Sequence, residues 1–325
     1  MRAVIIACLA IVAFATAAPN GFSNKEFAGY FQSWTAGWAS DPAKHSIARM
    51  PPYVTIINIA FARWNLQYNK GQRTFGGTGI DFSSDFNTVA GAIKLYKEKT
   101  GGKVLLSVGG ATYTDFKSAN FKAAADIVED LGIDGIDIDY EPAGGACSWA
   151  TGGNSCPGDN DLVWLIENYR RALPSPKLLT AAGWSTGAFG YDRFPSDRYK
   201  ANIKGANFGL FINPLKKVGQ LLDAIFIMSY DASNDLPVTE TLEAYRGLYK
   251  GALLIGVEVP PEAWGGHVLN MGEVENFINY GKQHNGQGIM LWSIQKQGNP
   301  SPTQVGQAVC RGLGLSGCDQ QLPSN

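Results

Sequence analysis

Short runs of aliphatic and β-branched residues recur at regular intervals along this chain and alternate with helical patterns. The helical patterns place apolar residues three and four positions apart, and most of them are followed by glycine, a common helix terminator. The short runs are apolar enough to be covered on both faces, as strands of a parallel sheet are. The expected strands are residues 27–32, 54–61, 104–108, 135–140, 178–183, 224–230, 253–257 and 288–293, and the expected helices are 86–99, 116–131, 162–172, 242–250 and 274–284.

Eight repeated units of this kind favour an α/β fold, a single closed (β/α)8 TIM barrel, over an open doubly wound sheet. The doubly wound alternative lacks its usual dinucleotide site, because no Gly-x-Gly-x-x-Gly motif follows the first strand. In a TIM barrel the active site lies at the carboxyl ends of the strands. The residues at those ends are therefore the candidate site.

The N-terminus resembles a secretory leader. A basic start is followed by an apolar run over residues 3–15 and by the small residues Ala15-Thr16-Ala17, a pattern that predicts a signal peptide at 1–17. The run is too short for a stable membrane span, and no later segment is long and apolar enough to be one. We therefore expect a secreted protein whose barrel domain occupies residues 18–325.

Four cysteines remain after the leader, which permits two disulfides in an oxidising compartment. Proximity favours Cys147 with Cys156 and Cys310 with Cys318, the second pair tying down a short C-terminal tail. Four cysteines allow three connectivities, so this pairing is a preference.

The composition argues against several partners. The formal net charge is −1, and basic residues are spread among acids without a stripe that would neutralise phosphates, so we expect no nucleic-acid partner. The histidines, His45, His267 and His284, are scattered, and neither cysteine spacing is Cys-x-x-Cys, so we expect no metal. The expectation is a monomer without cofactors that binds no membrane.

One expected strand carries a row of acids. Successive strand side chains point to opposite faces, so Asp137, Asp139 and Glu141 share one face and the alternating apolar residues share the other. Buried acids need partners or become protonated, so the row predicts a site where carboxyl pKa values are pushed apart. Asp134 has the wrong parity for the row and is expected to be structural.

Aromatic side chains accompany these acids at the strand ends. Trp34, Trp184 and Trp292 follow or end three of the expected strands. Flat aromatic faces beside fixed polar groups suit pyranose rings, and the alternative is that these tryptophans are core residues.

Four motifs, in order on the expected strands, make the chain resemble glycoside hydrolase family 18, the family of many chitinases. The resemblance covers roughly residues 25–312. The motifs are Ser107-x-Gly109-Gly110 on the third strand, Asp134-x-x-Asp137-x-Asp139-x-Glu141 on the fourth, Met228-x-Tyr230-Asp231 on the sixth and Trp292 on the eighth.

The resemblance implies retaining hydrolysis of β-1,4 bonds next to N-acetylglucosamine, in which the substrate's acetamido oxygen is the nucleophile. Glu141 would be the general acid and later the base. Asp139 would hold the acetamido N–H and share a proton with the buried Asp137, and Tyr230 would orient the acetamido carbonyl.

The remaining site residues come from the same resemblance. Ser107 would bind Asp137, Met228 and Asp231 would shape the pocket, and Trp292 would be its floor. Substrate contacts, with chitin or N-acetylglucosamine oligosaccharides, are expected from Trp292, Met228, Asp231, Ser107, Gly109, Gly110, Tyr30, Trp34 and Trp184.

Two departures from the family pattern stand out. Many members read Asp-Trp-Glu-Tyr-Pro where this chain reads Asp139-Tyr140-Glu141-Pro142, which leaves one family contact unassigned. Only about 30 residues separate the expected seventh and eighth strands, too few for the small α+β module of several processive members. We therefore expect an open groove that cuts inside chains.

The resemblance leaves three function classes open. The first is a secreted endochitinase. The second is an endo-β-N-acetylglucosaminidase acting on N-glycan cores with the same carboxylates. The third is a lectin-like relative without activity, a class that usually lacks the acid corresponding to Glu141.

Overall fold

A computed structural model describes residues 21–142, 147–150, 153–205, 207–264 and 266–323 of this chain. Eight parallel strands close into one barrel, and neighbouring strands follow the order β1-β10-β9-β8-β7-β4-β3-β2. The prediction of a TIM barrel is confirmed. The barrel strands are β1 (Glu26–Gln32), β2 (Ile56–Ala62), β3 (Lys103–Gly109), β4 (Gly135–Asp139), β7 (Leu178–Trp184), β8 (Ala224–Met228), β9 (Ala252–Glu258) and β10 (Gly288–Trp292).

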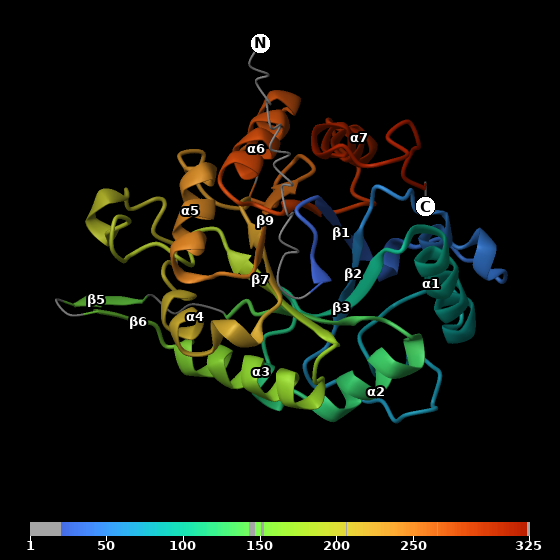
Figure 1. The fold of residues 1–325 in the computed structure, drawn as a ribbon. Coiled ribbons are helices and arrows are strands. Elements are labelled where there is room, and N and C mark those ends of the chain that lie inside the picture. The colour runs from blue at the N-terminus through green and yellow to red at the C-terminus, as the bar shows by residue number, and fades with distance from the viewer. Residues whose placement is uncertain (1–20, 143–146, 151–152, 206, 265, 324–325) are drawn as a thin grey trace, which may run out of the picture.

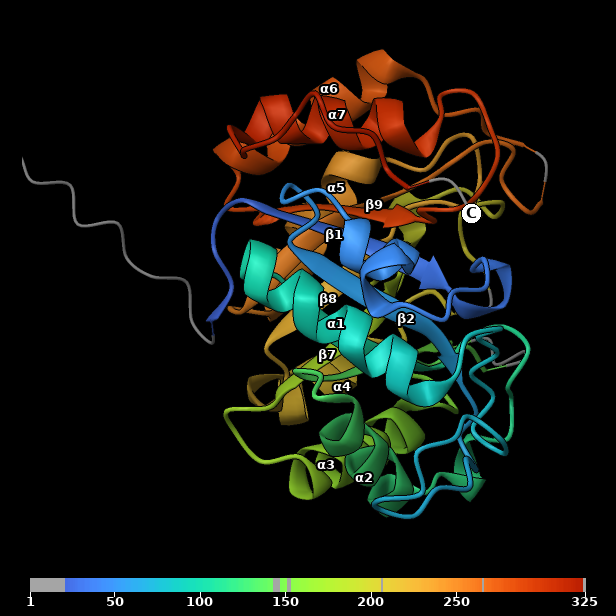
Figure 2. The ribbon, with the colours of Figure 1, turned by 90° about the vertical axis from the view of Figure 1, so that its right-hand side faces the viewer.

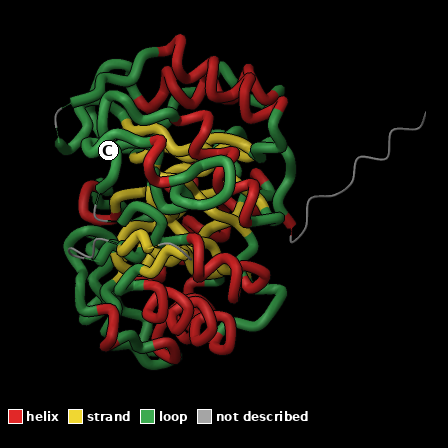
Figure 3. The backbone as a smooth tube through the Cα atoms, turned by 90° about the vertical axis from the view of Figure 1, so that its left-hand side faces the viewer, coloured by secondary structure: helices red, strands yellow, loops and turns green. Residues whose placement is uncertain are grey.

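Helices surround the barrel (Figure 1 and Figure 3). All five expected helices are present, with α2 starting later than predicted because Asn120 caps it and a short 3-10 turn precedes it. Two further helices, α4 and α7, were not expected, and three 3-10 turns replace a helix between β1 and β2. The helices are α1 (Phe86–Thr100), α2 (Phe121–Leu131), α3 (Asp159–Ala172), α4 (Ile212–Val218), α5 (Val238–Leu248), α6 (Met271–Gln283) and α7 (Pro302–Leu313).

Glycine ends two of the helices as expected. Gly101 after α1 and Gly132 after α2 have φ angles of 69° and 67°, in the left-handed region. At the start of α7, the Ser301 side chain accepts from the Gln304 backbone N–H, and Gln304 returns a bond to Ser301. Local sequence signals therefore set several of the helix boundaries.

Two disulfides have the predicted pairing. Cys147 is bonded to Cys156 and Cys310 to Cys318. The first closes a loop that contains a short hairpin, β5 (Ser148–Ala150) with β6 (Gly153–Ser155), which projects from the barrel in Figure 1. The second joins α7 to the C-terminal tail. The expected signal peptide lies outside the described residues.

The barrel strands separate two apolar regions. Ile136 and Ile138 of β4 pack in the layer between barrel and helices, whereas Asp137 and Asp139 point into the barrel with Met228 of β8 and Met290 of β10. The carboxyl ends of the strands lie toward the right of Figure 2. The acids are therefore presented at the mouth where TIM barrels carry their sites.

The connection from β9 to β10 adds little at this mouth. In its described part, residues 259–264 and 266–287, α6 is the one regular element, and no α+β module is present. Among the described helices, none combines the length and apolar character that a membrane span requires.

Candidate functional site

Asp137 lies at the bottom of the acid row, inside a set of three hydroxyl donors. Its carboxylate accepts from Tyr30 at 2.7 Å and Ser107 at 2.8 Å on one oxygen, and from Thr180 at 2.7 Å on the other. Ser107 and Thr180 are its strand partners on β3 and β7. Burial raises the pKa of Asp137, and the three donors oppose that rise by stabilising the ionised form.

Asp139, two residues along the strand, has a different environment. It is 3% exposed, and its Oδ1 has no hydrogen-bond partner among the described residues. Burial raises the pKa of Asp139 well above its usual value, and the negative charges of Glu141 and Asp137 raise it further. Because Asp137 has three donors and Asp139 lacks them, we assign the shared proton to Asp139.

Glu141 follows the end of β4 and is half-buried at the mouth. Burial raises the pKa of Glu141 to about 6. Hydrogen bonds from the Asp139 side chain and the Ala111 backbone N–H lower this pKa, while the charge of Asp231 raises it. The three acids therefore have different environments: hydroxyl donors oppose the raised pKa of Asp137, the charges of Glu141 and Asp137 add to the raised pKa of Asp139, and burial raises the pKa of Glu141 to about 6.

Tyr230 follows β8, which is separated from β4 by a single strand, β7. Its hydroxyl lies 3.8 Å from the sulfur of Met290, a weak acceptor. Burial raises the pKa of Tyr230 well above 10, and the charge of Asp139 adds to the rise. Tyr230 is therefore a neutral hydroxyl with capacity to donate to a ligand.

Four residues expected to contact substrate are buried beneath the mouth, and Ser107 binds Asp137 as the resemblance implied. Ser107 and Tyr30 are 0% and 1% exposed and hold Asp137. Gly109 has a φ of 112°, and a Cβ there would lie 2.1 Å from the Asp139 carbonyl oxygen. Gly110 is also buried, and its N–H donates to that oxygen at 2.9 Å. In this structure these four residues contact Asp137 or the Asp139 carbonyl oxygen.

An aromatic floor adjoins the acids. The rings of Trp292 and Phe61 stack with centroids 5.6 Å apart, and Phe61 stacks on Trp34 at 6.1 Å. Trp34 is 47% exposed. Phe61 ends the second expected strand and so belongs to the candidate site by position, although it was not among the expected substrate contacts.

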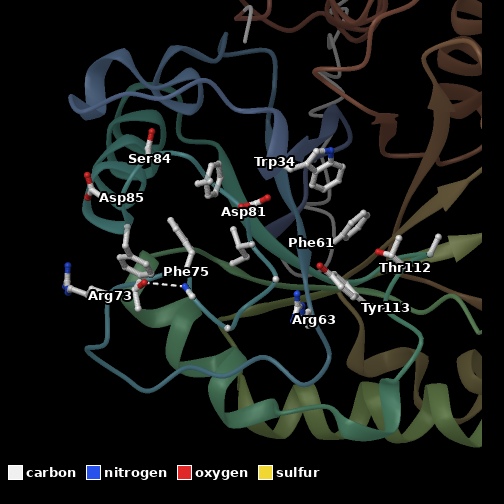
Figure 4. Close-up of a pocket in the computed structure, with 18 of the residues that line it drawn as sticks. Trp34, Phe61, Arg63, Arg73, Phe75, Asp81, Ser84, Asp85, Thr112 and Tyr113 are labelled. Atoms are coloured by element: carbon white, nitrogen blue, oxygen red, sulfur yellow. Dashed lines mark hydrogen bonds between the residues drawn. The ribbon is translucent and has the colours of Figure 1, made fainter.

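The floor continues into a cavity of about 980 Å³ beside the β2–α1 connection. Figure 4 shows Trp34, Phe61 and Tyr113 at one end and Arg73 and Asp85 at the other. Its walls combine aromatic rings with polar side chains, a lining that suits an oligosaccharide better than an apolar ligand.

Three other expected residues lie as follows. Met228 is 9% exposed and packs in the barrel interior. Trp184 is partly buried beside this interior cluster, and its indole N–H donates to the Tyr140 carbonyl at 3.1 Å. Asp134 lies at the opposite end of β4 from the mouth, where Lys97 and the Val104 backbone N–H bind it at 2.7 and 2.8 Å. Asp134 therefore has the structural environment that its parity predicts.

Known proteins resemble the chain over most of its length. A chitinase of Plasmodium falciparum is 25% identical over 257 residues, which cover 67% of this chain and 64% of that protein. Endochitinase 1 of Metarhizium robertsii is 27% identical over 258 residues, covering 71% and 55%. The chain thus spans less than two thirds of the length of both curated relatives.

Solved structures share the fold at low identity. A GH18 chitinase from Pseudoalteromonas aurantia has a TM-score of 0.61 and 19% identity, covering 89% of this chain and all of that one (100%). Human YKL-39, described as a pseudo-chitinase with retained chitooligosaccharide binding, has a TM-score of 0.59 and 14% identity, covering 89% and 100%. Shared fold alone therefore does not distinguish hydrolysis from binding.

The family profile gives the assignment that these structures do not. The profile described as glycosyl hydrolases family 18 matches residues 26–254, which include the acid row, the Ser107 and Met228 motifs and six complete barrel strands. The chain belongs to glycosyl hydrolase family 18.

Proposed function

We propose that this protein is a secreted retaining endochitinase that hydrolyses β-1,4 bonds between N-acetylglucosamine units with the help of the substrate's acetamido group. The observation that carries the proposal is the row of Asp137, Asp139 and Glu141 at the mouth, in which Asp137 is held by three hydroxyl donors and Asp139 Oδ1 has no hydrogen-bond partner among the described residues. The chitinases among its relatives support the substrate class. The two disulfides support export to an oxidising compartment.

In this proposal a sugar ring lies on Trp292, with its scissile oxygen toward Glu141. Glu141, with a pKa of about 6, donates its proton to the leaving oxygen as the glycosidic bond breaks. The acetamido oxygen attacks the anomeric carbon at the same time, so a positive oxazolinium ion forms. Glu141 then takes a proton from water, which opens this ion with overall retention.

The other residues stabilise the acetamido group during this step. Asp139 has an unpaired Oδ1 that accepts the acetamido N–H and faces the developing positive charge. Tyr230 donates its hydroxyl to the acetamido oxygen, which aims that oxygen at the anomeric carbon. In the resting site the three donors stabilise ionised Asp137 and leave the shared proton on Asp139, and when Asp139 accepts the acetamido N–H this proton passes to Asp137, so that Asp139 faces the positive charge as a carboxylate.

The open mouth supports cutting within chains. The described part of the β9–β10 connection contributes only α6, and the cavity beyond Phe61 extends the groove past the acids. A chain can therefore lie across the mouth without being threaded from an end.

Replacing Glu141 by Gln tests the proposal. The Gln side chain keeps the shape but cannot donate the proton, so kcat on N-acetylglucosamine oligomers should fall about 10²- to 10⁴-fold while oligomer binding is retained. Glu167→Gln, the same change at an exposed carboxylate of α3, is the control and should leave kcat unchanged. Undiminished hydrolysis by Glu141→Gln would refute the assignment of Glu141 as the acid. If the wild type releases high-mannose glycans from a glycoprotein and does not hydrolyse chitin oligomers, the substrate is an N-glycan core rather than chitin.

A further inference from the structure

A buried glutamate ties together two connections at the mouth of the barrel. Glu262, 5% exposed, lies between β9 and α6 and accepts two hydrogen bonds on Oε2. One comes from the backbone N–H of Asp231, after β8, at 2.8 Å, and the other from the indole N–H of Trp264 at 2.5 Å. The Trp264 backbone N–H also lies 3.4 Å from Asp231 Oδ1. The two connections are therefore joined through one carboxylate.

The Asp231 turn held in this way belongs to the catalytic machinery. Asp231 directly follows Tyr230, and its φ of 47° is uncommon for a residue other than glycine. Its charge is among the causes that raise the pKa of Glu141. The hydrogen bond from the Asp231 backbone N–H to Glu262 therefore holds in place both the Tyr230 hydroxyl and the Asp231 charge, which act on the site of Glu141.

Trp264 itself is presented to solvent. It is 45% exposed, although its indole N–H is already paired with Glu262. Gly266 backs the ring closely, since a Cβ at that position would lie 1.7 Å from the ring carbon Cη2. With the N–H paired and one side covered, the exposed part of the indole is an apolar surface of fixed orientation, the kind of surface on which a pyranose ring stacks.

The position of Trp264 complements the aromatic floor. The stacked rings of Trp34 and Phe61 lie over β1 and β2, whereas Trp264 is tied to the turn after β8. In the closed order of strands, β8 and β2 lie on different sides of the barrel. An oligosaccharide lying on the floor beside Glu141 and continuing across the mouth would meet Trp264.

We propose that Trp264 is a sugar-stacking platform on the β8–β9 side of the groove, and that Glu262 is the positioning residue that couples this platform to the Asp231 turn. The ligand is one pyranose ring of a β-1,4-linked N-acetylglucosamine oligomer, so the inference rests on the proposed function. A sugar ring stacked on Trp264 fixes the indole that donates to Glu262, and Glu262 in turn fixes the turn that carries Tyr230 and Asp231.

The first test is the dependence of kinetics on chain length. Trp264→Ala should raise KM about tenfold for the hexamer and leave KM for the shortest hydrolysed oligomer unchanged, because only a long chain reaches the platform. Trp264→Phe should restore most of the loss. Trp164→Ala is the control, since Trp164 is a 37% exposed tryptophan on α3 that packs against Phe121 on the helical side of the molecule.

The second test is the pH profile. Glu262→Ala frees the Asp231 turn, and the charge that raises the pKa of Glu141 is no longer held in place, so the alkaline limb of kcat/KM should move to lower pH. Glu262→Gln keeps an oxygen that accepts both bonds and should restore the wild-type limb. A purely structural role of Glu262 would lower Tm without moving this limb.

The outcomes separate this inference from the proposed function. Wild-type hydrolysis of oligomers with no length-dependent change in Trp264→Ala would overturn the platform, and a fixed pH limb in Glu262→Ala would overturn the coupling. If the wild type hydrolyses no oligomer, the proposed function fails. In that case calorimetry compares the affinity of the hexamer for the wild type and for Trp264→Ala. Weaker binding to Trp264→Ala would support the stacking role of Trp264, and equal affinity or no binding would overturn it.

Discussion

Removal of the Tyr30 hydroxyl tests where the proton sits in the acid row. Tyr30 donates to Asp137 at 2.7 Å in a fully buried setting, beside the donors Ser107 and Thr180. Tyr30→Phe takes away one donor and leaves the ring in place between Phe61 and Trp292. The size of the effect depends on whether Asp137 is ionised.

The expected magnitude follows from the charge of the acceptor. A hydrogen bond to a charged group contributes about 1.5–3 kcal/mol and one to a neutral group about 0.5–1.5 kcal/mol. The folded-state pKa of Asp137 is raised, so its ionisation costs stability as pH rises above the unfolded value, and losing a donor increases that cost. We therefore expect Tyr30→Phe to lower the free energy of unfolding by about 2–3 kcal/mol at pH 7 and by about 1 kcal/mol at pH 3, where Asp137 is protonated.

Denaturant unfolding at both pH values measures this difference. Tyr96→Phe is the matched control, because the buried Tyr96 hydroxyl donates to the neutral carbonyl of Val54 at 2.5 Å. The control should lose about 1 kcal/mol at both pH values. An equal loss at pH 3 and pH 7 in Tyr30→Phe would refute the reasoning, because it would mean that Asp137, rather than Asp139, carries the proton in the resting protein.

Three further predictions concern the groove and the fold. Because Glu141 has a pKa of about 6 and acts first as an acid, kcat/KM should fall as pH rises through about 6. This alkaline limb of the pH profile should move when Asp139 is replaced by Asn or when another group near Glu141 is changed. A limb that stays at the same pH in all of these variants would speak against the assignment. Phe61→Ala removes the ring stacked between Trp34 and Trp292, so kcat/KM on the hexamer should drop about tenfold, whereas an unchanged value would exclude the ring from the substrate floor. Replacing Cys310 and Cys318 together by Ser opens a loop with a sequence separation of 8, which should lower the free energy of unfolding by about 2.5 kcal/mol in chemical denaturation, and a loss near zero would show that the tail does not constrain the unfolded chain.

Much of the barrel was predictable because its signals are local. Strand alternation placed Asp137 and Asp139 on the inner face, and the partners that Asp137 finds on β3 and β7 follow from parallel register. The capping box at Ser301 and Gln304 is also a local sequence signal, so the start of α7 was predictable although α7 was not among the expected helices.

The remaining features depend on closure of the barrel. Tyr30 looked like a residue that contacts substrate, yet β1 and β4 lie on different sides of the closed sheet, so Tyr30 reaches across the interior to Asp137. No local sequence pattern predicts that the Tyr30 hydroxyl comes within hydrogen-bonding distance of Asp137. The short helix α4 contains Pro214 and carries little periodicity, and it too escaped prediction.

The configuration of the first product tests the central claim most directly. If the acetamido oxygen is the nucleophile and Glu141 serves in turn as acid and base, the anomeric carbon is inverted twice, so the first sugar released keeps the β configuration. NMR spectra recorded in the first moments of hexamer digestion, before mutarotation, report this configuration. The account predicts the β-anomer, and the α-anomer as first product would contradict it.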